Sequence, residues 1–179
     1  KNDAFYDSRQ NVTAREGHFL LWPKPESPDV NQQDVNAQPN FNILAVQSRI
    51  SGTITGPEAL GAETSGKIEG DFFAQANDNI NLFRLRHAYV RLSWDNTQLL
   101  TGQFWNPMFV TSCFPGTVSF NTGVPIQPFA RNPQVRLTQS FGDFQVIAAA
   151  LAQRDYPSRI DKAVSSKFLR NSGTPDMHL

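Results

Sequence analysis

Charged side chains recur at alternate positions in several stretches of the sequence, and both signs of charge occur among them: Arg49, Lys67, Glu69, Asp71, Arg91 and Arg136. Alternation with a period of two places such residues on one face of a β-strand. Cations and anions fixed on one polar wall create a transverse electric field, which is how a water-filled pore selects small charged solutes. The chain has 11 Arg and 5 Lys, and the rigid fork of Arg suits fixed positions on such a wall. The alternative is that these residues cover the solvated face of a soluble β-sandwich.

Other arrangements that could carry chemistry are weaker. The single cysteine, Cys113, stands in no nucleophile motif, and no carboxylate pair outside the strands forms a catalytic frame, so we predict no enzyme. His87 beside Tyr89 is better explained as a pair of polar wall residues than as an acid–base pair. The loop 75–82, centred on Asp78, offers oxygen ligands for calcium, although a solvated loop is the simpler interpretation. We therefore expect no metal and no cofactor.

Composition excludes several classes of protein. The chain of 179 residues has 16 basic and 16 acidic side chains, so no net charge attracts it to nucleic acid. One cysteine excludes an internal disulfide framework. No apolar run approaches the ~20 residues that a transmembrane helix needs. The 14 Phe and the many Asn and Gly favour β-structure with polar loops, and a low mean hydropathy is compatible with a transmembrane β-barrel, because only alternate strand residues face lipid.

The alternating pattern predicts an all-β fold. Residues 1–17 show no clear period and are interpreted as an N-terminal arm, and the Pro-rich and Asn-rich residues after Trp22 are interpreted as a loop. Gly56 and Pro57 are expected to end the strand that precedes them. The run from Val146 to Ala152 could be a helix, but its length and the tight turn before it favour a strand. Strands are predicted at 18–22, 42–55, 63–73, 83–94, 97–105, 134–141 and 144–153, with another strand opening at 177–179.

The connections between these strands alternate between long and short. Residues 23–41, 107–131 and 155–175 form long loops, whereas residues 95–96 and 142–143 form tight turns. Short periplasmic turns and long outer loops are typical of an antiparallel outer-membrane barrel, and strands of about ten residues fit a tilted crossing of the bilayer. A soluble sandwich has no reason to sort its loops in this way.

A transmembrane barrel has an apolar outer face and a polar lumen. We expect the apolar faces of the strands to meet lipid, at Ile50, Ile54, Ile68, Val90, Leu92, Val135 and Leu137. Arg84 and Arg86 are in phase with that apolar face, so we expect them at the outer rim or at a β-bulge rather than at a subunit interface. The polar faces predict the pore-lining residues Arg49, Lys67, Glu69, Asp71, Tyr89, Arg91, Gln103 and Arg136.

The long connection 107–131 decides between two roles. It is long enough to fold into a lumen, where Phe109, Phe114 and Phe120 could anchor it against the wall. A loop that narrows the lumen makes a selective pore, whereas a loop that fills it makes a non-conducting barrel with a structural or interaction role in an envelope complex. The sequence leaves both alternatives open.

Five motifs occur in order along the chain: Gln47-Ser48-Arg49, Ile68-Glu69-Gly70-Asp71-Phe72-Phe73, Leu85-Arg86-His87-Ala88-Tyr89-Val90, Leu100-Thr101-Gly102-Gln103 and Arg131-Asn132-Pro133-Gln134-Val135-Arg136. Together they resemble the motifs of the DcaP-like outer-membrane porins, in a version typical of Bacteroidales. The resemblance covers about residues 44–153. It implies a sixteen-stranded barrel in the outer membrane of a Gram-negative bacterium. That barrel would be a homotrimer in contact with lipid, passing small and often anionic solutes. The matching motif residues are Arg49, Glu69, Asp71, Arg86 and Arg136.

The sequence departs from the family in three places. The N-terminal arm lacks a coiled-coil heptad, and residues 109–120 differ from the family pattern, so the family's choice of solute does not carry over. The strands counted here make half of such a barrel. We therefore expect residues 18–179 to be the N-terminal half of the barrel, and the parent gene to encode a chain about twice as long with a secretory signal.

Overall fold

The computed structural model describes residues 2–12, 22–45, 48–73, 81–114, 129–154 and 157–179. These divide into two compact units. The first unit comprises Lys1–Arg49, Asp71–Arg84 and Cys113–Val124, and the second comprises Ile50–Gly70, Leu85–Ser112 and Pro125–Leu179. In the described part of the chain, no helix has the length and apolar character needed to span a membrane.

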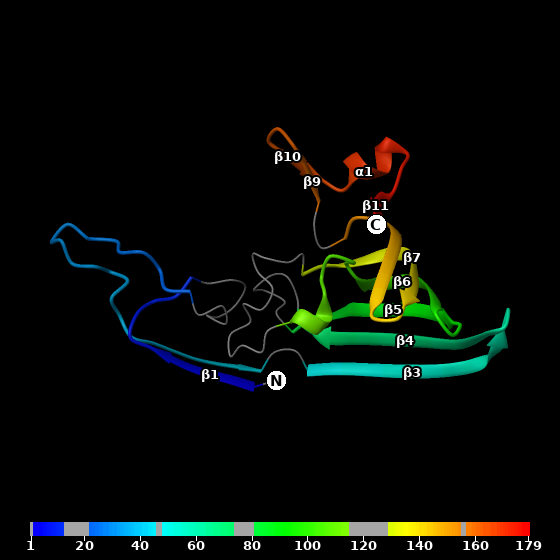
Figure 1. The fold of residues 1–179 in the computed structure, drawn as a ribbon. Helices are drawn as coiled ribbons and strands as arrows, with labels where there is room; N and C mark the ends of the chain where they lie inside the picture. The colour runs from blue at the N-terminus through cyan, green and yellow to red at the C-terminus, as the bar shows by residue number, and fades with distance from the viewer. Residues whose placement is uncertain (1, 13–21, 46–47, 74–80, 115–128, 155–156) are drawn as a thin grey trace. The chain divides into compact units, whose positions relative to one another are not determined.

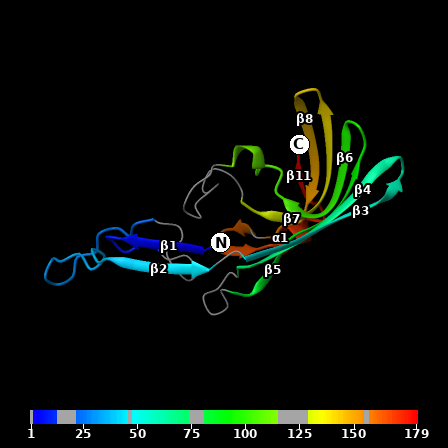
Figure 2. The same ribbon diagram turned by 90° about the horizontal axis from the view of Figure 1, so that it is seen from below.

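The first unit contains an antiparallel strand pair, β1 (Asn2–Asp7) and β2 (Asn40–Ala45), drawn in blue and cyan in Figures 1 and 2. Tyr6 lies opposite Phe41, and both side chains are exposed, whereas Phe5 is buried. The sequence did not predict β1, because its partner β2 lies more than thirty residues away, a pairing that no local pattern reveals.

Two carboxylates, those of Asp29 and Asp34, organise the described part of the loop between β1 and β2. Asp34 Oδ1 accepts hydrogen bonds from the backbone N–H groups of Ser27 at 2.9 Å and Asn36 at 3.0 Å, and Asp34 Oδ2 lies 2.6 Å from Nη1 of Arg9. The backbone N–H of Ser27 is the main cause that lowers the pKa of Asp34, since it stabilises the ionised form. A predicted polar loop is thus tied together by local hydrogen bonds.

The second unit is built on a seven-stranded sheet with the order β11-β8-β7-β6-β5-β4-β3. Figure 1 shows this sheet bending from the layer of β3, β4 and β5 toward β7 and β8. Its strands are β3 (Ser48–Ala59), β4 (Ala62–Phe72), β5 (Phe83–Ser93), β6 (Thr97–Trp105), β7 (Arg131–Phe141), β8 (Phe144–Leu151) and β11 (Asp176–His178). The pairs β5–β6, β6–β7, β7–β8 and β8–β11 are antiparallel. The prediction of an all-β antiparallel fold is confirmed.

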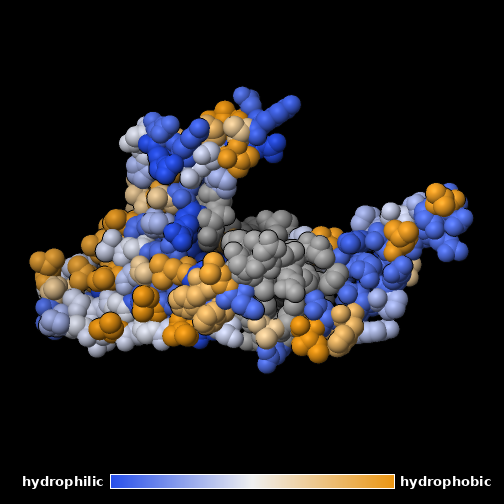
Figure 3. Space-filling view, turned by 180° about the vertical axis from the view of Figure 1, so that it is seen from behind, coloured by the Kyte–Doolittle hydropathy of each residue, from blue (hydrophilic) through white to orange (hydrophobic). Residues whose placement is uncertain are grey.

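Cross-strand register assigns the two faces of this sheet. One row, which we call the outward row, runs through Val90, Thr101, Val135, Ala150 and Met177 on five successive strands. The adjacent row, on the opposite face, runs through Arg91, Leu100, Arg136 and Ala149. We call the face that carries the outward row the outward face, and the face that carries the row of Arg91 and Arg136 the polar face. Of the seven residues predicted to meet lipid, all but Leu92 are exposed, and Leu92 is half-buried. Figure 3 shows hydrophobic residues gathered over this sheet at the lower left.

Several strand boundaries were predicted incorrectly, including the start of β7, which lies at Arg131 rather than at residue 134, and the end of β8, which lies at Leu151 rather than at residue 153. The stretch 42–55 is not one strand, because its first part belongs to β2 and pairs with β1, whereas β3 begins at Ser48. Gly56 and Pro57 do not end β3, which continues to Ala59. Pro57 is tolerated because β3 is the edge strand of this sheet. The predicted strand 18–22 lies almost wholly outside the described residues.

The true turn after β3 is Leu60-Gly61, where both residues have positive φ, 56° and 70°. This is the two-residue hairpin geometry that matches the twist of paired strands. Trp94, in the next tight turn along the chain, donates from Nε1 to the Leu60 carbonyl at 3.1 Å. The two turns are therefore joined by a side chain, at the end of the sheet where the short connections lie.

The predicted loop 155–175 contains regular structure. It holds a small hairpin, β9 (Ser158–Ile160) and β10 (Ala163–Ser165), and the helix α1 (Lys167–Ser172), which ends at Gly173 with φ 74°. These elements are too short to show a period in the sequence, which is why the pattern missed them. In contrast, β11 pairs with β8, so the strand predicted to open near Met177 is confirmed.

Candidate functional site

Two consecutive residues of β5, Arg86 and His87, are both buried, and this break in the alternation indicates a β-bulge. Leu85 and Val90 are both exposed, although one has an odd and the other an even residue number. The exposed side of the strand therefore changes phase between them, at the buried pair Arg86 and His87. One extra residue in a strand produces this change of phase. Gln103 on β6 donates from Nε2 to the carbonyls of Leu85 at 3.0 Å and Arg86 at 2.9 Å. Of the outer rim and the β-bulge that the sequence left open for Arg86, this pattern favours the bulge.

Glu69 holds two cations on the polar face of the second unit. Its Oε1 accepts from Nε of Arg86 at 2.8 Å, and its Oε2 lies 2.9 Å from Nζ of Lys67. The side chains of Arg86 and Glu69 are 4% and 6% exposed, so this ion pair is almost completely removed from water. Nε2 of His87 lies 4.0 Å from the same carboxylate. A buried carboxylate shared by several donors is a rigid electrostatic element.

The first unit contains a second pair of the same kind. Asp71, which is fully buried, accepts hydrogen bonds from Nε of Arg84 at 2.7 Å and from Nη2 at 3.3 Å. The guanidinium of Arg84 also lies 4.8 Å from the centroid of the Phe73 ring. The spacing of two between Glu69 and Asp71 on β4 thus matches the spacing of two between their partners on β5.

Two further arginines on the polar face flank one leucine. Arg91 on β5 and Arg136 on β7 lie directly opposite Leu100 on β6, from its two sides. The guanidinium of Arg91 lies 5.3 Å from the Tyr89 ring, and that of Arg136 lies 5.7 Å from the Phe104 ring. Among the described residues, neither arginine forms an ion pair with a carboxylate. Ring faces hold these two cations in place without neutralising them.

An aromatic cluster covers the ends of β6 and β7. Phe109 is buried, with its ring centroid 4.6 Å from that of Trp105 and 5.2 Å from that of Phe129. The guanidinium of Arg131 lies 4.8 Å from the Trp105 centroid. Thus Phe109 anchors the start of the predicted constriction loop against the wall. In contrast, Phe114 is 41% exposed.

Two further residues that the sequence singled out are exposed. Arg49 is exposed at the start of β3, and Cys113 is exposed in a short 3-10 helix at Thr111–Cys113. Phe120 and most of the loop 75–82 lie outside the described residues. No group of three or more potential metal ligands occurs in the described part of the chain.

Sequence reasoning did not place Arg84, Arg86, Trp105 or Arg131 in these clusters. The first two were out of phase with the polar face, and only the bulge at Arg86 and His87 explains their position. The paired spacing of Glu69 and Asp71 with Arg86 and Arg84 is the signal that could have revealed them. Trp105 and Arg131 are the terminal residues of β6 and β7, where alternation carries little information.

Comparison with known proteins gives two matches. Residues 26–168 match the family described as DcaP outer membrane protein. The fold is similar to the crystal structure of the outer membrane channel DcaP of Acinetobacter baumannii, with a TM-score of 0.58 and 22% sequence identity. That match covers 89% of this chain and 44% of the channel, so this chain spans less than half the length of that protein. No curated protein matches the chain.

Proposed function

Because the chain belongs to the DcaP outer membrane protein family, we propose that it forms part of the wall of a β-barrel channel through which small hydrophilic solutes diffuse. The family is one of outer membrane proteins, and the antiparallel sheet is a fragment of a porin barrel. In this proposal the polar face lines the lumen, the outward face meets lipid, and residues 107–131 narrow the pore. The barrel is a homotrimer, with residues 1–17 as an N-terminal arm.

The observation that carries the proposal is the arrangement of charge on the polar face. Lys67 and Arg86 share the carboxylate of Glu69, whereas Arg91 and Arg136 have no carboxylate partner among the described residues. Charges on a narrow wet wall act at reduced dielectric and are weakly screened. The two arginines beside Leu100 therefore give the channel a weak preference for small anions.

We expect the double variant Arg91→Gln with Arg136→Gln to lose this preference. Both side chains would keep polar character, but the wall would lose its unneutralised positive charge, so permeability to chloride and potassium should become nearly equal. The measurement is the reversal potential of the full-length protein in a planar bilayer under a potassium chloride gradient.

The control for this experiment is Arg159→Gln with Lys162→Gln, which removes two charges from the β9–β10 hairpin and its turn rather than from the polar face. An equal change of reversal potential in the control would contradict the assignment of Arg91 and Arg136. A folded wild-type protein without conductance would contradict the channel itself and favour a barrel whose lumen is filled.

A second prediction compares two neighbouring residues of β7 that face opposite ways. Leu137 lies on the outward face and is exposed, whereas Thr138 lies on the polar face and is half-buried. Arginine at a lipid-facing position near the midplane costs about 2–4 kcal/mol, whereas arginine facing the lumen does not. We expect Leu137→Arg to reduce the heat-resistant, fast-migrating barrel species in electrophoresis and Thr138→Arg to preserve it. Equal behaviour of the two variants would contradict the assignment of faces.

A further inference from the structure

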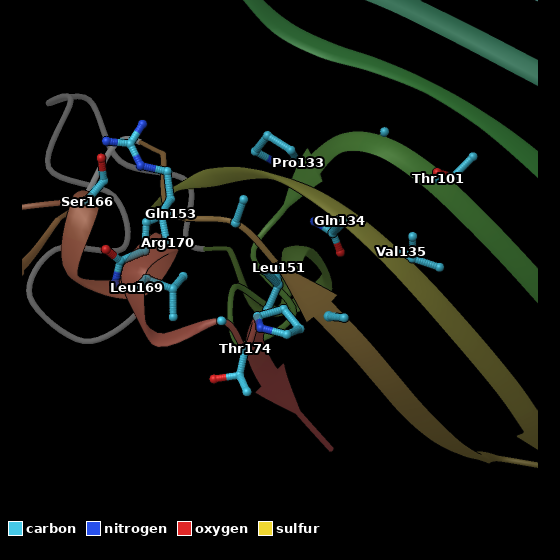
Figure 4. A pocket seen from close by; sticks show the side chains of 15 residues that line it. Thr101, Pro133, Gln134, Val135, Leu151, Gln153, Ser166, Leu169, Arg170 and Thr174 are labelled. Atoms are coloured by element: carbon cyan, nitrogen blue, oxygen red, sulfur yellow. The ribbon is translucent and has the colours of Figure 1, made fainter.

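A groove lies between the strands β6 to β8 and the segment that carries α1. It has a volume of about 660 Å³, within the usual range for small-ligand sites. Figure 4 shows Thr101 and Val135 on the strand side and Leu169, Arg170 and Thr174 on the side of the α1 segment. The two sides of this groove therefore come from the sheet and from a long connection.

The floor of the groove is part of the outward row. Thr101, Val135 and Ala150 are the middle residues of that row, and all three line the groove. The row continues beyond the groove to Val90 and Met177, which are 52% and 69% exposed. Small side chains in the middle and larger ones at the ends leave a shallow apolar channel that is continuous with the proposed lipid-facing surface.

The α1 side of the groove carries positive charge. Residues 163–175 contain Lys167 and Arg170 and no acidic residue. Arg170 lines the groove, and Lys167 lies three residues earlier on the helix, so that the two project from the same side. Both are exposed, and among the described residues neither side chain forms an ion pair. The unneutralised cation of Arg170 lines an apolar groove, and that of Lys167 lies about one helical turn away, so this side is complementary to a lipid with a phosphate headgroup.

The strand connections place α1 at the end of the sheet that carries the long loops. The turns Leu60-Gly61, Asp95-Asn96 and Gly142-Asp143 lie at the opposite end. In outer-membrane barrels the long loops face outward. The groove therefore opens toward the outer leaflet, provided that the sheet is a barrel wall as proposed above.

We propose that this groove binds a phosphorylated lipid of the outer leaflet. One acyl chain lies over Val135 and Ala150, and Arg170 and Lys167 hold a headgroup phosphate through charge-assisted hydrogen bonds. A second copy of the chain is a poorer occupant, because a symmetric contact would bring together two sets of the same cations.

The test measures binding of a bis-phosphorylated lipid A to the full-length protein in detergent by native mass spectrometry. Arg170→Gln with Lys167→Gln should weaken binding by about tenfold or more, the usual effect of losing charge-assisted contacts. The control is Arg159→Gln with Lys162→Gln, which removes the same charge from the neighbouring hairpin and should leave binding unchanged. Wild-type protein should bind phosphatidylethanolamine and inorganic phosphate at least tenfold more weakly than lipid A.

A second pair of variants tests the apolar floor. Ala150→Phe fills the groove and should also weaken lipid binding, whereas Ala148→Phe enlarges a residue of the same strand and face that does not line the groove. The proposal is overturned if both charge variants weaken binding equally, if inorganic phosphate binds as well as lipid A, or if Arg170→Gln with Lys167→Gln changes only the oligomeric state. Reversal potentials of the same variants keep the two proposals separate, since lipid binding can be lost while ion selectivity persists.

Discussion

Glu69→Ala is expected to lower the free energy of unfolding by about 3–5 kcal/mol, the usual cost of removing one partner of a buried ion pair. The substitution would leave the guanidinium of Arg86, which is 4% exposed, without the carboxylate oxygen now 2.8 Å from its Nε. It would also remove the carboxylate that lies 2.9 Å from Nζ of Lys67, so Lys67 and Arg86 would lose the anion that they share. The measurement is urea unfolding of the full-length protein refolded in detergent, followed by tryptophan fluorescence.

Glu63→Ala is the matched control for Glu69→Ala. Glu63 lies on the same strand and the same alternating face as Glu69, but it is exposed and forms no ion pair among the described residues, so its removal should change stability by less than about 0.5 kcal/mol. The double variant Glu69→Leu with Arg86→Met should recover much of the loss, because an apolar pair of similar volume avoids the buried charge. A loss below about 1 kcal/mol in Glu69→Ala would contradict the structural role assigned to this pair.

The sequence predicted the central strands well because their alternation is strict. The boundaries predicted for 63–73, 83–94 and 97–105 agree with β4, β5 and β6 to within a residue at each end. In β4 one face is charged or polar and the other carries Ile68 and Phe72, so a shift of one residue would exchange the two faces. Such a pattern determines both the strand and the direction of each side chain.

Features that depend on distant partners could not be predicted in this way. β1 exists because it pairs with β2 across a long loop, and β3 continues through Pro57 because it lies at the edge of the sheet. The bulge at Arg86 and His87 changes the phase of β5, and strict alternation cannot anticipate an extra residue. For the same reason the ion pairs of Arg84 and Arg86 were not predicted, although their carboxylate partners were assigned to the pore wall.

The polar face also shows how one fold separates two uses of arginine. Arg86 is buried against Glu69, where its charge is compensated and its role is to fix the wall. Arg91 and Arg136 lie against aromatic rings, where no carboxylate of the described residues neutralises their charge, as the proposed anion preference requires. The Glu69→Ala variant tests the structural role of Arg86, and the reversal-potential experiment tests the electrostatic role of Arg91 and Arg136.

Gly102→Ala is expected to lower the free energy of unfolding by about 3–5 kcal/mol, the sum of backbone strain and overpacking. Gly102 has φ 126°, a conformation that side-chain-bearing residues rarely adopt. A Cβ atom there would lie 2.2 Å from the carbonyl oxygen of Ala88 and 2.7 Å from the Cα of Tyr89, and neither backbone atom can move independently of β5. Urea unfolding under the conditions used for Glu69→Ala measures the effect.

Gly142→Ala separates the two contributions to the Gly102 prediction. Gly142 also has positive φ, 60°, but a Cβ atom there would meet nothing within 4 Å, so this variant carries the strain without the collision and should lose about 1–2 kcal/mol. Gly102 precedes Gln103, whose amide satisfies the two carbonyls at the bulge. A collision at Gly102 should therefore displace β5 beside Arg86 and His87 and also reduce the single-channel conductance of the molecules that still fold. Equal losses of stability in the two glycine variants would show that the close approach of β5 and β6 contributes nothing, and that the bulge is held by other contacts.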